Sequence, residues 1–367
     1  MIALRIVVDI NHPGQVHYFR NFVHDVRKHG HEVLITASEK EITFRLLREY
    51  GLDFVPLGSY GNTLAKKALN IPRLDMKMYE AVRKFRPDVF LGFGSIKNAH
   101  VSRLLRKPAI AFDDTEPSPV EHALYVPFTD AILTPACFRK DFGRKHIRYD
   151  GYIELAYLHP DYFRPDPAVL DMAGVGKNDP YTVLRFVGWN AANDIGHAGF
   201  DLETKRRAVR ELEKYGRVFI SSEMPLPADL EPYRLRTPPG LIHHLLHYAR
   251  LLVCDSGTMT TEAAILGTPV VRCDSIVSGQ DFGNFAELEH RYGLINNFAS
   301  PREALDRAIT LVSRPRLKDE WRAKREAMLR EKIDVNAFMV KFVEEYPGSF
   351  ASCRDQGTAR CWTGSSS

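Results

Sequence analysis

The sequence predicts an α/β protein made of two doubly wound halves, each a largely parallel sheet with helices on both faces. Three observations indicate this. Short, nearly continuous apolar segments typical of buried strands alternate with longer segments of helical periodicity. The alternation stops at a proline-containing segment, residues 157–177, and then begins again. Finally, 367 residues are too many for one ordinary core and enough for two domains.

The first half opens with an apolar strand over residues 4–10, followed by a loop that contains Asn11-His-Pro-Gly14. Further strands are expected at 32–36, 54–57, 88–93, 108–112 and 131–134, and helices at 16–29, 39–50, 74–85 and 99–105. Gly30 and Gly51 directly follow two of these helices, which is a common way for a helix to end.

The second half repeats the pattern, and one of its helices has a clear start signal, with Ser300 as N-cap, Pro301 in the first turn and Glu303 as capping partner. Strands are expected at 181–187, 217–220, 251–254 and 269–272, and helices at 202–215, 241–248, 258–266, 317–331 and 335–345. We therefore expect an N-terminal domain over 1–165, a C-terminal domain over 178–333, a helix over 334–346 that packs back toward the first domain, and a disordered tail over 348–367.

Composition narrows the class of function. The net charge of +4 is far below that of a dedicated nucleic-acid binder, so no nucleic-acid partner is expected. The five cysteines form no C-x-x-C pair, and the helical histidines His243, His244 and His247 show no acidic partner, so no metal site is expected. The apolar start is too short to span a membrane and lacks a signal-cleavage pattern, which indicates a cytoplasmic protein.

The strand at 251–254 ends in a tight turn and a helix that together suit a diphosphate. The turn contains Asp255, Ser256, Gly257 and Thr258. Gly257 lets the backbone approach a ligand, a hydroxyl of Ser256 or Thr258 can bind phosphate or cap the helix, and the helix N-terminus favours anions. Glu262 follows in the first helical turn, where its carboxylate can accept ribose hydroxyls. The alternative is an ordinary turn capped by Asp255 or Ser256.

Other candidates also follow strands, because ligands of such sheets bind outside the carboxyl ends of the strands. His12 and His17, beside Gly14, are candidate bases or structural histidines. A second group is the acidic turn of Asp113, Asp114 and Glu116, whose carboxylates either act as acid and base or lie in a solvated loop. Glycine turns complete the set as possible sugar or phosphate contacts: Gly94, and the loop of Gly188, Trp189 and Asn190.

Two resemblances add to these predictions. Asp255-Ser-Gly-Thr-Met-Thr-Thr-Glu262, with Gly267-Thr-Pro269 after it, resembles an element of the non-hydrolysing UDP-N-acetylglucosamine 2-epimerases and of the MurG-type glycosyltransferases. The span 4–345 resembles the mainly archaeal DUF354 family, through residues 9–20, 113–116 and 150–160. The resemblance implies a GT-B-like fold: two doubly wound Rossmann-like domains with an interdomain cleft.

The resemblance also implies a function. The turn at Ser256–Thr258 would bind phosphate and Glu262 the ribose of a UDP-sugar donor, with no cofactor required. Thr258 replaces the second glycine of the epimerase turn, and the epimerase histidines are missing, which favours a glycosyltransferase. A 2-epimerase-like enzyme and a non-catalytic nucleotide-sugar-binding protein are the alternatives. The expected acceptor is a sugar or a lipid-linked molecule; a peripheral membrane contact through the mixed-charge segment 314–332 and a homodimer are further hypotheses.

Overall fold

The computed structural model describes residues 3–40, 42–61, 64–186, 200–222, 225–274 and 282–355. The chain forms two compact units. Unit 1 comprises Met1–Tyr162 and Lys332–Ser367, and unit 2 comprises Phe163–Glu331. Most of the proline-containing segment that separates the two predicted domains therefore belongs to unit 2. Two parallel sheets flanked by helices confirm the predicted α/β class.

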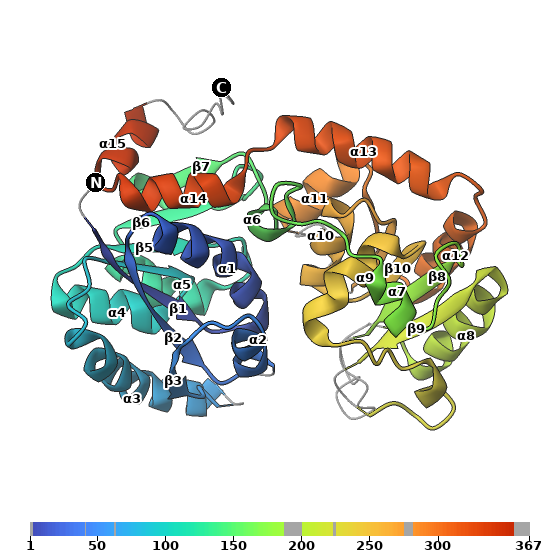
Figure 1. Cartoon of the computed structure of the whole chain (residues 1–367), viewed down its shortest axis with the longest axis horizontal. Helices are drawn as coiled ribbons and strands as arrows, with labels where there is room; N and C mark the ends of the chain where they lie inside the picture. Colours follow the sequence, from blue (N-terminus) through green and yellow to red (C-terminus); the bar gives the residue numbers. More distant parts are fainter. Residues whose placement is uncertain are drawn as a thin grey trace. The chain divides into compact units, whose positions relative to one another are not determined.

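Unit 1 is built on a seven-stranded parallel sheet in the order β3-β2-β1-β4-β5-β6-β7 (Figure 1). Its strands are β1 Arg5–Ile10, β2 Glu32–Ser38, β3 Val55–Gly58, β4 Val89–Phe93, β5 Ala109–Phe112, β6 Ala131–Pro135 and β7 His146–Tyr149. Its helices are α1 Pro13–Lys28, α2 Thr43–Glu49, α3 Leu64–Arg83, α4 Ile96–Leu105, α5 Pro119–Tyr125, α6 Leu155–Leu158, α14 Val335–Glu344 and α15 Gly348–Asp355. Helices α1 and α2 pack together, as do α3, α4 and α5, which is the two-sided cover expected from right-handed crossovers.

Sequence periodicity misplaced some elements of unit 1. Helix α3 begins ten residues before the predicted start at 74 and runs through Pro72, a residue that usually disfavours a helix interior. Its C-terminal half buries Leu74, Met78 and Val82 at helical spacing against the sheet, so tertiary packing maintains the helix. Elements α5 and β7 were not predicted, because both are short and lack a clear period.

Unit 2 is built on a five-stranded parallel sheet in the order β12-β11-β10-β8-β9. Its strands are β8 Tyr181–Arg185, β9 Arg217–Ser221, β10 Leu251–Cys254, β11 Val270–Cys273 and β12 Ile295–Phe298. Its helices are α7 Ala168–Met172, α8 Leu202–Leu212, α9 Ile242–Tyr248, α10 Gly257–Ile265, α11 Gly283–His290, α12 Pro301–Val312 and α13 Leu317–Glu331. Helix α10 packs between α9 and α11, whereas α8 packs against α12. The predicted N-cap is confirmed, because the Ser300 side chain accepts a hydrogen bond from the Glu303 amide.

Helix α13 fastens unit 2 through its basic side chains. The Lys318 ammonium donates to the His247 carbonyl at 2.8 Å, Lys324 donates to the Gly293 carbonyl at 2.8 Å, and Arg325 donates to the Ile265 carbonyl at 2.6 Å. These carbonyls lie at or just beyond the C-termini of α9, α11 and α10, where the helix dipole favours a cation. Some of the basic side chains on which the hypothesis of a membrane contact depends therefore bind backbone carbonyls within unit 2.

The C-terminal helices belong to unit 1. Helix α14 packs on α1, and Asn336 Nδ2 donates to Asp25 Oδ2 at 2.7 Å. The prediction of a disordered tail is wrong for Gly348–Asp355, which forms α15 because Phe350 stacks near Tyr346 and Cys353 is buried. Residues 356–367 lie outside the described residues. Within the part of the chain that the structure describes, no helix has the length and apolarity needed to cross a membrane.

Candidate functional site

The predicted phosphate turn lies where the chain reverses direction across the sheet of unit 2. Strand β10 lies between β8 and β11, with Cys254 in register with Arg185 on one side and Arg272 on the other. The chain goes from β8 to β9 on one side and later to β10 on the other, so the carboxyl edge of the sheet at β8 and β10 is a topological switch point. Helix α10 begins at Gly257, directly after this point.

The N-terminus of α10 keeps the features that favour an anion. The first amide groups of a helix have no acceptor within it. Ser256 is the N-cap residue, but its side chain makes no capping hydrogen bond, so the capping role predicted for it is wrong. A side-chain carbon on Gly257 would lie 3.3 Å from Phe285 Cζ, and the Arg272 guanidinium lies over that ring at 4.0 Å from its centroid. A larger residue at position 257 would therefore have to displace the Phe285 ring by a few tenths of an ångström.

Glu262 is held by a histidine that the sequence analysis left without a partner. Glu262 is only 4% exposed and belongs to the second turn of α10, not the first. His243 Nε2, from α9, donates to Glu262 Oε1 at 2.9 Å, and both side chains are buried. The prediction that His243 has no acidic partner is thus wrong. The hydrogen bond fixes one carboxylate oxygen and with it the orientation of the group.

The acidic turn of unit 1 is an ordered cluster at the carboxyl end of β5, not a solvated loop. Asp113 Oδ2 accepts hydrogen bonds from His122 Nε2 at 3.0 Å and from the Tyr125 hydroxyl at 2.5 Å, and Asp113 Oδ1 accepts from the Thr115 amide at 2.8 Å. His122 and Tyr125 both come from α5, so the unpredicted helix supplies the groups that hold Asp113. Lys140 Nζ approaches His122 Nδ1 at 3.4 Å.

Asp114 has the chemical character of a general acid or base. Burial first, then the neighbouring Asp113 carboxylate and Glu116, raise the pKa of Asp114 from its ordinary value of 3.8 to about 7. Both protonation states are therefore populated near neutral pH, which is what proton transfer requires. Glu116 is buried beside it, and Glu116 Oε1 accepts a hydrogen bond from the Arg139 amide at 3.3 Å.

The two candidate histidines of the first loop have structural partners. His12 is the N-cap of α1, and its Nδ1 accepts the Gly14 amide proton at 3.1 Å. His17 is buried, stacks on Tyr157 with ring centroids 5.4 Å apart, and accepts a hydrogen bond from the Tyr50 hydroxyl at 3.1 Å. These contacts match the structural interpretation of both histidines better than the role of a base.

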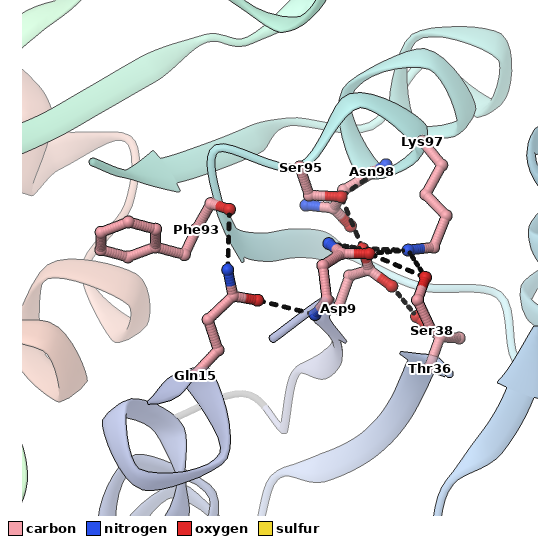
Figure 2. Close-up of polar contacts among 9 residues, drawn as sticks. Asp9, Gln15, Thr36, Ser38, Phe93, Ser95, Lys97 and Asn98 are labelled. Carbon is pink, nitrogen blue, oxygen red and sulfur yellow. Dashed lines mark hydrogen bonds and ion pairs between the residues drawn. The ribbon is translucent and has the colours of Figure 1, made fainter. Parts of the chain in front are cut away.

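Sequence reasoning missed a polar cluster at the carboxyl ends of β1, β2 and β4 (Figure 2). Its centre is an ion pair between Lys97 Nζ and Asp9 Oδ2 at 2.8 Å, in which both side chains are 0% exposed. Thr36, Ser38 and Ser95 surround the pair. One local signal was present, since Lys97 stands in the first turn of a helix, where the helix dipole disfavours a cation.

The predicted residues thus fall into two groups within separate units. Unit 2 contains the turn from Asp255 to Thr258 together with Glu262, and unit 1 contains His12, Gly14 and His17, Gly94, and the acidic turn. Gly94 directly follows β4 with a φ of +52°, and a side-chain carbon there would lie 3.7 Å from the Tyr125 ring. The predicted contacts Gly188, Trp189 and Asn190 lie outside the described residues.

One group in the described residues has ligand spacing for a metal ion. Ligand atoms of His159, Asp161 and Asp334 lie within 4.8 Å of one another. Asp334 already accepts from the Ala337 amide at 2.9 Å and from the Tyr162 hydroxyl at 2.9 Å, and Asp161 is exposed. The group therefore functions as a helix cap with an exposed acid beside it, and we derive no chemistry from it.

Comparisons with known proteins place the fold and the family. An uncharacterised protein from Methanocaldococcus jannaschii is 27% identical over 289 residues, which cover 74% of this chain and 82% of that protein. The solved UDP-GlcNAc 2-epimerase from Neisseria meningitidis bound to UDP-GlcNAc aligns with a TM-score of 0.61 at 11% identity, covering 93% of this chain and 100% of the other. A glycosyltransferase from Streptomyces sp. SF2575 aligns with a TM-score of 0.58 at 17% identity, again covering 93% and 100%.

These solved structures confirm the GT-B-like fold that the resemblance implied. The sequence model of the family described as "Protein of unknown function (DUF354)" matches residues 4–282, which is most of the chain. The chain belongs to the DUF354 family.

Proposed function

We propose that this protein is a GT-B-type glycosyltransferase that uses a UDP-sugar as donor. The observation that carries the proposal is the glycine turn at the switch point of unit 2, followed by a helix in which His243 orients the buried Glu262. A helix N-terminus binds a diphosphate, and a fixed carboxylate accepts two vicinal hydroxyls of a ribose. Neighbours of the same fold that bind UDP-GlcNAc support this assignment.

The proposed binding mode assigns a role to each part of the turn. The backbone amides from Gly257 onward receive the diphosphate, and the absence of a side chain at Gly257 lets phosphate oxygens approach. The helix dipole stabilises the negative charge that develops on the leaving diphosphate. Glu262 sits one turn farther along the helix, where it would hold the ribose.

In unit 1, we assign proton transfer to Asp114. A pKa of about 7 makes its carboxylate a competent base toward an acceptor hydroxyl at neutral pH. Asp113 is already committed to His122, Tyr125 and the Thr115 amide, so its role is to raise the pKa of Asp114 and keep the turn rigid. His12 and His17 take no part in the proposed chemistry, because their rings have structural partners.

An epimerase is the second candidate, favoured by the same titrating carboxyl. A carboxyl with a pKa near neutrality can remove a proton from a sugar carbon as well as from a hydroxyl. Solved structures with this fold include UDP-GlcNAc 2-epimerases. A nucleotide-sugar-binding protein without activity is the third candidate.

Calorimetry with UDP-, GDP-, CMP- and dTDP-sugars tests the donor site. We expect binding of UDP-GlcNAc or another UDP-sugar, its loss in Glu262→Ala, and no change in Glu326→Gln, an exposed acid of α13 in the same unit. If no nucleotide sugar binds, all three candidates are wrong. Incubation with UDP-GlcNAc alone then separates them: formation of UDP-ManNAc indicates the epimerase, whereas turnover only after addition of a sugar or lipid-linked acceptor indicates the transferase.

A further inference from the structure

The buried Lys97–Asp9 pair is unusual for energetic reasons. Lys97 belongs to the first turn of α4, where the helix dipole opposes a positive charge, and its side chain is 0% exposed. Removing both charges from water costs several kcal/mol per ion, and such a pair often contributes less stability than apolar side chains of the same size. Something other than stability accounts better for its presence at the carboxyl edge of the sheet.

Every hydrogen atom of the Lys97 ammonium has an acceptor. It donates to Asp9 Oδ2 at 2.8 Å, to Ser38 Oγ at 2.9 Å and to the side-chain oxygen of Asn11. Burial lowers the pKa of Lys97, and the Asp9 carboxylate opposes this. With all its protons engaged and no exposed surface, Lys97 is a positioning group and not a nucleophile.

The acceptors of this ammonium connect three loops. Asp9 and Asn11 flank the end of β1, Ser38 ends β2, and the Ser95 hydroxyl, which donates to Asp9 Oδ2 at 2.5 Å, caps α4 after β4 (Figure 2). Asn11 Nδ2 also donates to Asp9 Oδ2 at 2.8 Å, and Ser38 Oγ donates to Asn11 Oδ1 at 2.9 Å.

Gln15 ties the first loop to the third. Its Oε1 accepts the Asn11 amide proton at 2.7 Å, and its Nε2 donates to the Phe93 carbonyl at 3.4 Å (Figure 2). The segments that the pair holds are therefore residues 11–14, which include the first two residues of α1, and residues 94–95, on the two sides of the point where the strand order of unit 1 reverses. In a doubly wound sheet this point is where a ligand binds.

We propose that Asp9 and Lys97 form a positioning pair that fixes the segments 11–14 and 94–95 in the geometry that receives the acceptor. The proposal rests on the proposed transferase function for the identity of the ligand. The fixing of the two segments by the Asp9–Lys97 pair does not depend on that function. Asp9 and Lys97 would act through Asn11 and Ser95 without touching the substrate.

The test compares the single variant Lys97→Met with the double variant Asp9→Asn/Lys97→Met. The single variant leaves a buried carboxylate without its cation, so it should lose stability or fail to fold. The double variant removes both charges and should recover stability. A matched control is the Arg5–Asp88 pair, which joins β1 and β4 at their opposite ends with its charged atoms 3.3 Å apart.

Hydrogen–deuterium exchange of the amides of residues 11–15 and 94–98 is the first readout. We expect exchange roughly tenfold or more faster in the double variant, at unchanged overall stability, and no such change in Arg5→Met/Asp88→Asn. Wild-type exchange in the double variant would overturn the proposal. This readout needs no substrate, so it holds even if the proposed function is wrong.

The second readout is the kinetics of transfer, measured with the donor and acceptor that the calorimetry and turnover assays identify. In the double variant we expect kcat to fall roughly tenfold or more while UDP affinity, measured by calorimetry, stays unchanged. A purely structural pair predicts that kcat recovers together with stability, and that result would also overturn the proposal. If the wild-type protein itself does not bind UDP, that result would instead contradict the proposed function.

Discussion

Replacing Asp114 with asparagine should make unit 1 more stable at pH 8 than the wild type, although it removes the proposed base. The change in pKa from 3.8 to about 7 means that the folded state holds this proton more tightly than the unfolded chain. Wild-type stability is therefore lost as the pH rises from about 4 to about 7, whereas asparagine does not titrate.

The size of the effect follows from the same pKa. At about 1.4 kcal/mol for each tenfold change in proton affinity, the shift corresponds to roughly 4 kcal/mol at most. The Asp114 side chain is partly exposed, and solvent screens part of its repulsion from Asp113 and Glu116, so we expect about 1–2 kcal/mol of added stability at pH 8. The advantage should vanish near pH 4, where the carboxyl is protonated in both states.

Hydrogen exchange of the β5 and β6 amides at several pH values measures this effect in unit 1 alone. The matched control is Asp141→Asn, since Asp141 is an exposed acid of the same unit. The Gly143 amide first, and then His146, lower the pKa of Asp141. The wild type therefore gains stability as Asp141 ionises, and Asp141→Asn should be slightly less stable than wild type above that pKa. If the difference in stability between Asp114→Asn and wild type does not depend on pH, the pKa of the Asp114 carboxyl is not raised. The assignment of Asp114 as base is then wrong.

Three further predictions concern unit 2. Replacing His243 with phenylalanine should weaken UDP binding by roughly tenfold, because Glu262 loses the bond that orients it; unchanged calorimetric affinity would show that this bond is irrelevant to ligands. Gly257→Ala should displace Phe285 and weaken UDP binding with little loss of urea stability, and equal losses of both would contradict a local effect. Burial lowers the pKa of Lys318 to about 7, so the stability of Lys318→Met should compare most favourably with that of wild type at or below pH 7, although the variant loses the hydrogen bond to the His247 carbonyl. The unfolded chain binds this proton up to about pH 10, so the advantage should shrink as the pH rises; a pH-independent difference in urea unfolding would refute it.

The sequence alone was enough for the architecture, because alternation of strand and helix is a local property. Helix α13 has the bounds 317–331 that its periodicity predicts, and Ser300 caps α12 as its capping signal indicates. The turns at Gly257 and at Asp113 directly follow the strands after which the sequence placed them. These signals need only the residues within a few positions of one another.

The chemistry of the candidate site was decided by tertiary structure. Strand order brings Lys97 beside Asp9 and places His243 from α9 next to Glu262 of α10, although neither pair shares a local pattern. Helix α13 illustrates the same limit, because its periodicity gave its bounds but did not show that Lys318 and Arg325 turn inward to helix ends.

The physical reason is that a side chain's charge and hydrogen bonds depend on what surrounds it after folding. Asp114 is an ordinary aspartate in the sequence, and burial beside Asp113 makes it titrate near neutrality. His12 follows a strand as a catalytic histidine would, yet the first turn of α1 uses its ring as a cap. The sequence indicated which loops follow the strands at the carboxyl edge of each sheet, and only the packing decided which of their side chains are engaged in structural contacts.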